Sequence, residues 1–79
     1  MNGTVVLDAR HLLCPIPVIR TQDRITSMQP GQTLQVIATD PGTRFDIPAW
    51  CRVHGHSVTE IDEAEGEIHF FIQVCSPCR

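Results

Sequence analysis

The segment Cys14-Pro15-Ile16-Pro17 constrains this chain more than any other stretch. Proline suits the first turn of a helix, where a missing N–H leaves no hydrogen bond unmade. A helix starting at Pro15 would place Cys14 at the N-cap, with its sulfur facing outward at the positive end of the helix dipole. That position lowers the pKa of a thiol from about 8.5. We expect an accessible, moderately activated thiol, because Pro15 and Pro17 remove two N–H groups that could bind an anion. The alternative is an inert cysteine beside a turn.

The length of 79 residues allows one small domain and no separate domain for a cofactor. A hydrophobic fraction of 42% indicates a globular chain rather than a disordered one. No apolar run approaches the roughly 20 residues of a membrane span, and residues 1–4 do not resemble a signal peptide. We therefore expect a cytoplasmic protein with reduced cysteines and no membrane partner. The net charge of −3 argues against direct binding of nucleic acid.

Hydrophobic periodicity predicts six elements in the order β-α-β-α-β-β. The strands are 4–8, 33–39, 56–62 and 67–74, the helices are 15–28 and 46–54, and a loop at 63–66 joins the last two strands. Pro30-Gly31 predicts a turn, and Gly55 predicts the end of the second helix. Asp46 is predicted as the N-cap of that helix, because this start keeps Pro48 in the first turn. The order predicts a two-layer α/β (α+β) sandwich with both helices on one face of the sheet.

The uncovered face of such a sheet would carry Val6, Ile37, Phe71 and Cys75. An open apolar strip of this kind is typical of a contact surface. We expect it to meet a partner protein or a second copy of the chain in a weak homodimer.

The Cys-Pro-x-Pro motif and its flanks resemble the TusA/SirA family of small sulfur carriers. The similarity runs from about Leu7 to Val74 and takes in Leu7-Asp8, Met28-Gln29-Pro30-Gly31, Asp40-Pro41, Asp46-Ile47-Pro48 and Gly55-His56. It implies a mixed four-stranded sheet with strand order 1-2-4-3. It also implies one TusA-like domain over residues 1–79. We expect residues 75–79, which follow the last strand, to form a flexible tail.

The resemblance further implies that Cys14 carries sulfur as a persulfide, so that the protein is a sulfurtransferase that needs no cofactor. The implied donor is a rhodanese or a cysteine desulfurase, and the implied acceptor is a DsrE-like or other thiol protein. Ile16 stands where members that serve tRNA 2-thiouridine formation tend to have Glu. This departure favours sulfur or thiosulfate metabolism over the tRNA alternative. His11 stands where the family tends to have Gly, and a positive φ there would strain His11.

Four other residues near Cys14 are candidates for the site. His11 is either a partner of the thiolate or a surface-loop residue. Arg10, Arg20 and Arg44 either form a positive rim that steers an acidic partner or are scattered surface charges.

The remaining polar and sulfur-containing residues have simpler interpretations. Trp50 and Cys51 lie on the apolar stripe of the second helix and are predicted to pack in the core. Asp40 and Asp46 are predicted as turn and cap residues. Cys75-Ser76-Pro77-Cys78 has the spacing of a dithiol or zinc motif, but we interpret it as a tail with incidental thiols rather than a metal site. A regulatory interaction module and a dithiol or metal protein are the alternatives to a sulfur carrier.

Overall fold

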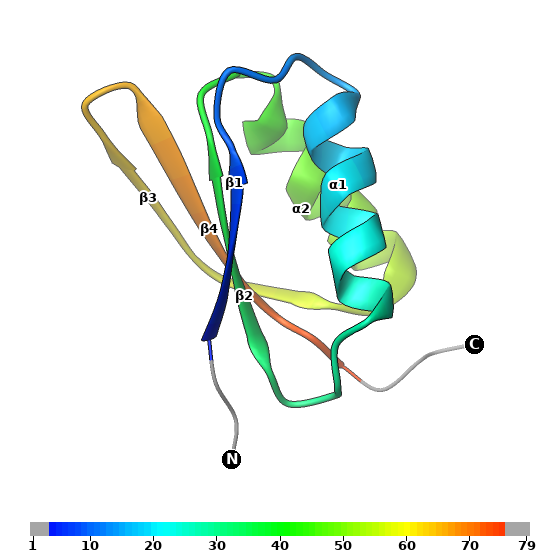
Figure 1. The fold of residues 1–79 in the computed structure, drawn as a ribbon. Coiled ribbons are helices and arrows are strands. Elements are labelled where there is room, and N and C mark those ends of the chain that lie inside the picture. The colour runs from blue at the N-terminus through cyan, green and yellow to red at the C-terminus, as the bar shows by residue number, and fades with distance from the viewer. Residues whose placement is uncertain (1–3, 76–79) are drawn as a thin grey trace.

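A computed structural model describes residues 4–75 of the chain; of the tail predicted at 75–79, residues 76–79 lie outside the described residues. The elements are β1 (Thr4–Ala9), α1 (Ile16–Thr26), β2 (Thr33–Ala38), α2 (Thr43–His54), β3 (Ser57–Ala64) and β4 (Glu67–Gln73). The predicted element order is therefore confirmed. Both helices lie on the same side of one twisted sheet (Figure 1). Neither helix among the described residues is long and apolar enough to cross a membrane.

The sheet has the order β1-β2-β4-β3, which confirms the topology that the resemblance implied. β1 runs parallel to β2, whereas β4 is antiparallel to both of its neighbours. Alternate residues of the central strands face the helices and form the core. The largest of these buried side chains are Leu34, Val36, Phe70 and Ile72. Cys51 of α2 is 1% exposed and belongs to this core, as predicted.

The first helix begins one residue later than predicted. Pro15 is its N-cap, Ile16 its first residue, and Cys14 precedes the cap rather than occupying it. The physical reason is a turn before the helix, in which the Ile16 N–H donates to the Leu13 carbonyl at 2.9 Å. The helix ends at Thr26 and is followed by the predicted Pro30-Gly31 turn, where Gly31 has φ of 93°.

The second helix begins at Thr43, three residues before the predicted start at Asp46. Thr43 is buried, and its hydroxyl and N–H donate to the Asp40 carbonyl at 2.7 and 3.0 Å. These bonds fix the start of the helix, although Pro48 then lies inside it and cannot donate to the Arg44 carbonyl. Asp46 is consequently in the first turn and not at the cap. The helix ends at Gly55, as predicted, with φ of 81°.

The hairpin between β3 and β4 is tighter than predicted. Only Glu65 and Gly66 form the turn, with φ of 53° and 80°, the two positive values that a type I′ turn requires. A register shift between Val58 and Glu60 makes a bulge in β3. The bulge lets Val58 and Ile61 lie opposite Ile72 and Phe70, on one face of the sheet.

The face of the sheet away from the helices is not the apolar strip that we expected. Strand pairing places Gln35 between Val6 and Phe71, and sets His69 beside Ile37. Gln35 Nε2 lies 2.9 Å from His69 Nδ1, and His69 Nε2 lies 3.1 Å from a Glu67 oxygen. Polar cross-strand neighbours therefore interrupt the predicted strip. The homodimer stays a prediction and loses this support.

Candidate functional site

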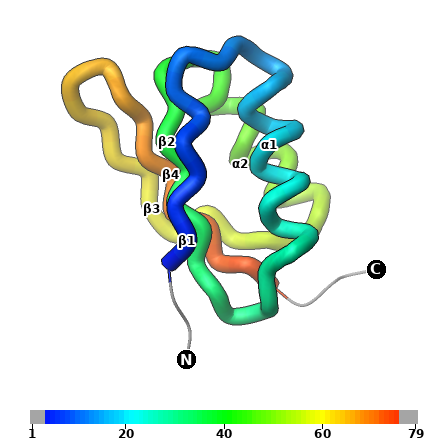
Figure 2. The backbone as a smooth tube through the Cα atoms, viewed as in Figure 1, coloured from blue at the N-terminus to red at the C-terminus, as the bar shows by residue number. Residues whose placement is uncertain are grey.

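Two loops at the same end of the sheet build the surroundings of Cys14. Because β1 and β2 are parallel, the loops that lead from them into α1 and α2 meet at their carboxyl ends (Figures 1 and 2). The backbone N–H of Cys14 donates to Asp40 Oδ2 at 2.9 Å. Its thiol donates a hydrogen bond to Asp46 Oδ2. Cys14 is half-buried, and its sulfur contacts a carboxylate that belongs to the other helix.

These contacts set the protonation of the thiol. The hydrogen bond to Asp46, together with desolvation and the negative charges of Asp46 and Asp40, raises the pKa of Cys14 to about 11. The expected lowering by the helix dipole is therefore wrong. That expectation assumed that Cys14 occupies the N-cap with no carboxylate nearby, whereas two carboxylates lie near it in the structure. At neutral pH the resting residue is a thiol.

The two prolines of the motif have different surroundings. Pro15 is exposed at the N-cap of α1, whereas Pro17, in the first turn of α1, is buried. The carbonyl of Pro17 accepts a hydrogen bond from the Thr21 hydroxyl at 2.8 Å. Pro17 thus anchors the first turn to the core, which fixes the position of the segment that carries Cys14.

His11 has a positive φ of 66°. We considered this conformation because the family tends to have Gly at this position. Its N–H donates to the Thr39 hydroxyl at 2.9 Å, which ties the loop after β1 to the end of β2. The side chain is exposed, and within residues 4–75 it has no hydrogen bond to Cys14. These contacts favour the interpretation of His11 as a loop residue.

The three arginines that were predicted to dock a partner are dispersed. Arg10 pairs with Asp8 at 2.9 Å and with Glu67 at 3.2 Å. Arg44 pairs with Glu63 at 2.6 Å. Arg20 is exposed on α1 and has no ion pair within the part of the chain that the structure describes. A docking role for these arginines remains a prediction.

The sequence interpretation missed two groups of residues at this site. Asp40 and Asp46, which we call the acidic pair, contact Cys14 rather than serving only as turn and cap residues. The exposed residues Leu13, Ile16 and Phe45, which we call the apolar collar, lie within two residues of Cys14 or next to Asp46 in the sequence. The available signal was the convergence of loops that follow parallel strands, together with apolar residues outside the buried stripes.

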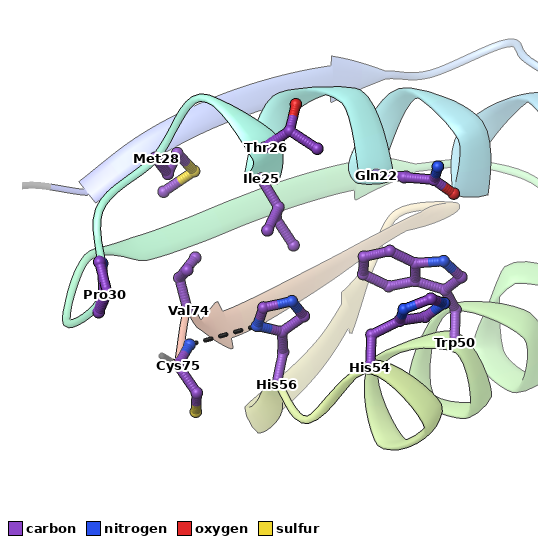
Figure 3. Close-up of a pocket in the computed structure, with 10 residues that line it drawn as sticks. All are labelled: Gln22, Ile25, Thr26, Met28, Pro30, Trp50, His54, His56, Val74 and Cys75. Atoms are coloured by element: carbon purple, nitrogen blue, oxygen red, sulfur yellow. Dashed lines mark hydrogen bonds between the residues drawn. The ribbon is translucent and has the colours of Figure 1, made fainter. Parts of the chain in front are cut away.

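A cavity of about 400 Å³ lies at the opposite end of α1 from Cys14. Trp50 stacks there on His54 and His56, with ring centroids 4.5 and 5.6 Å apart (Figure 3). The Cys75 N–H donates to His56 Nδ1 at 3.2 Å. Trp50 is half-buried against the core, in agreement with the predicted packing role. Cys75 lies along this cavity, so it is not placed to take sulfur from Cys14 of the same chain.

Comparisons with known proteins agree with this geometry. The family described as "Sulfurtransferase TusA" matches residues 5–74. Sulfur carrier protein TusA of Pseudomonas aeruginosa is 43% identical over 68 residues, which cover 86% of each chain. YrkF of Bacillus subtilis is 43% identical over 72 residues, which cover 89% of this chain and 38% of YrkF.

The fold is also similar to that of a solved structure. A crystal structure of a SirA-like protein from Desulfitobacterium hafniense superposes with a TM-score of 0.78 at 25% identity, and covers 94% of this chain and 99% of that one. The sequence match and the shared topology extend over almost all described residues. The chain therefore belongs to the TusA family of sulfur carrier proteins.

Proposed function

We propose that this sulfur carrier holds sulfane sulfur as a persulfide on Cys14 and passes it directly from one protein to another. The observation that carries the proposal is the placement of a half-buried free thiol at the entrance of α1, next to exposed apolar side chains. Of the other described cysteines, Cys51 is enclosed in the core, and Cys75 lies at the far end of the helical layer. Cys14 is thus the thiol best placed to meet the sulfur of another protein.

The reaction is an exchange between a thiol and a persulfide. The Cys14 thiolate attacks the outer sulfur of a donor persulfide, the donor S–S bond breaks, and the donor cysteine leaves as a thiolate. An acceptor thiolate then attacks the outer sulfur on Cys14, and Cys14 leaves in turn. Each step forms one S–S bond and breaks another, so it requires no external oxidant or reductant. The proton lost by Cys14 is balanced by the one that the departing donor thiolate takes up.

The donor is a rhodanese or a cysteine desulfurase, and the acceptor is a DsrE-like or other thiol protein. Ile16, in place of Glu, supports sulfur or thiosulfate metabolism, and sulfur relay to tRNA 2-thiouridine formation is the alternative. Free thiols are needed at every step, which is consistent with the reducing cytoplasm as the place of action.

Mass spectrometry of the intact protein tests the assignment. Incubation with a sulfane-sulfur donor should add the mass of one sulfur atom to the wild-type protein and to Cys75→Ser. Cys14→Ser should gain nothing. Undiminished loading of Cys14→Ser would exclude the carrier role of Cys14 and would favour a non-catalytic interaction module.

A further inference from the structure

The surface around Cys14 combines exposed apolar side chains with negative charge. Leu13 and Phe45 are each 74% exposed, and Ile16 is 39% exposed. Leu13 directly precedes Cys14, and Phe45 directly precedes Asp46. The apolar collar therefore flanks the chain segments that hold the thiol and its carboxylate partner. Exposed large apolar side chains on the segments that carry a polar site are typical of a protein contact surface.

The acidic pair within this surface is not neutralised by the protein itself. Arg44 is two residues from Asp46, but its guanidinium pairs with Glu63 in β3. Arg10 is held by Asp8 and Glu67 on the sheet. Within residues 4–75, neither Asp40 nor Asp46 takes part in an ion pair. A partner that covers this surface therefore meets two carboxylates without a counterion.

We propose that the donor protein docks on the apolar collar with apolar side chains that surround a basic one, and that pairing of this basic side chain with Asp46 releases the Cys14 thiol for reaction. The inference rests on the proposed function and adds the chemistry of the partner to it. A partner without a cation would remove water from the two carboxylates of the acidic pair without supplying a positive charge in return, which disfavours binding.

The hydrogen bond between Cys14 and Asp46 connects docking to reactivity. In the free protein, the Asp46 carboxylate accepts the thiol hydrogen bond and opposes formation of a thiolate. A guanidinium or ammonium group that binds Asp46 engages this acceptor and adds positive charge near the sulfur. Both changes favour the thiolate, which is the nucleophile. Cys14 is thus kept protonated until a basic partner is present, and the transfer then follows the balanced exchange described above.

Two synthetic peptides test the charge of the partner. Both carry a cysteine persulfide flanked by leucines; one has arginines on either side and the other has glutamates. Transfer to Cys14 is followed by mass spectrometry of the peptide fragment that contains it. We expect the arginine peptide to load the wild-type protein about fivefold faster at low ionic strength, the size of an exposed ion pair, with the difference reduced by salt.

Matched variants separate this effect from general electrostatics. Asp46→Asn should remove most of the preference for the arginine peptide, whereas Asp23→Asn, an exposed carboxylate on α1, should retain it. Phe45→Ser should slow loading by both peptides, and Val53→Ser, which alters an exposed residue near the other end of α2, should not. Equal rates with the two peptides, or an unchanged preference in Asp46→Asn, would overturn the inference. Failure of both peptides to load wild-type Cys14 would instead reject the proposed function itself.

Discussion

The carboxylate of Asp40 accepts the backbone N–H of Cys14 at 2.9 Å, across 26 residues of sequence. The same carboxylate accepts the N–H of Gly42 at 3.3 Å, at the start of α2. One side chain therefore ties the entrance of α1 to the entrance of α2. The position of the thiol relative to Asp46 depends on this link, because each of the two groups belongs to one of the two entrances.

Replacement of Asp40 should weaken both the fold and the site. Asp40→Ala removes two hydrogen bonds to a charged acceptor, and we expect a loss of about 1–2 kcal/mol in the free energy of unfolding. Urea denaturation measures this loss. Asp62→Ala, which removes an exposed carboxylate of β3, is the control and should change the stability by less than about 0.5 kcal/mol. Equal effects of the two substitutions would contradict the role of Asp40.

Replacement of Asp46 should make Cys14 more reactive at neutral pH. The pKa of about 11 arises mainly from the hydrogen bond to Asp46, and an amide at that position carries no charge and can donate to a thiolate. Asp46→Asn should therefore lower the pH midpoint of Cys14 alkylation by iodoacetamide. A fall of one pH unit corresponds to a roughly tenfold higher rate below the midpoint.

The direction in which the pH midpoint of Cys14 alkylation changes is the critical observation. A dominant helix dipole would give wild-type Cys14 a midpoint below that of a free thiol, and Asp46→Asn would then change little. Asp23→Asn serves as the matched control, since its carboxylate lies exposed on α1 and, within residues 4–75, has no hydrogen bond to Cys14. Digestion and mass spectrometry separate alkylation of Cys14 from that of Cys75.

Glycine at position 11 should stabilise the fold without changing the thiol. His11 has a left-handed backbone, with φ of 66°, that glycine adopts without a steric penalty. We expect His11→Gly to raise the free energy of unfolding by about 0.5–1 kcal/mol. The rate and pH midpoint of Cys14 alkylation should stay as in the wild type. A shifted midpoint would show that the imidazole acts on the thiol after all.

The hairpin turn offers a second test of backbone strain. Glu65 has φ of 53° and precedes Gly66, in a two-residue turn that prefers Asn-Gly. Glu65→Asn should therefore stabilise the protein by about 0.5–1 kcal/mol in urea denaturation. Glu60→Asn, within β3, is the comparison substitution, and it should be neutral or destabilising because Asn disfavours strands. A gain of similar size in both variants would refute the turn argument.

Local sequence patterns predicted most of the fold, because each helix, strand and turn depends mainly on residues that are close together in the sequence. The alternation in β4, the Pro30-Gly31 turn and the Gly55 helix end each depend on neighbouring residues, and all are confirmed. The strand order came from the family resemblance. The start of α2 was wrong because the penalty of an internal Pro48 was weighed without the two hydrogen bonds of Thr43 to Asp40.

The candidate site was predictable only in part. Cys14 stood out because of the prolines that follow it. Its contacts with the acidic pair join positions 26 and 32 residues apart, and nothing in the local sequence indicates them. The protonation of Cys14 was misjudged for the same reason, because a dipole argument considers one helix and the carboxylates come from the loop and helix that follow β2. The open sheet face was misjudged because strand register decides which polar residue lies between Val6 and Phe71.

Pro48 has a consequence for the motion of α2. Since proline has no N–H, the carbonyl of Arg44 lacks its donor in the helix, and Asp46 lies between these two residues. The first part of α2 therefore has one backbone hydrogen bond fewer than an uninterrupted helix, which lowers the energy needed to open the helix at Arg44. The carboxylate that restrains the sulfur thus lies in a part of the helix that lacks one backbone hydrogen bond, which eases its displacement from Cys14 by an approaching protein.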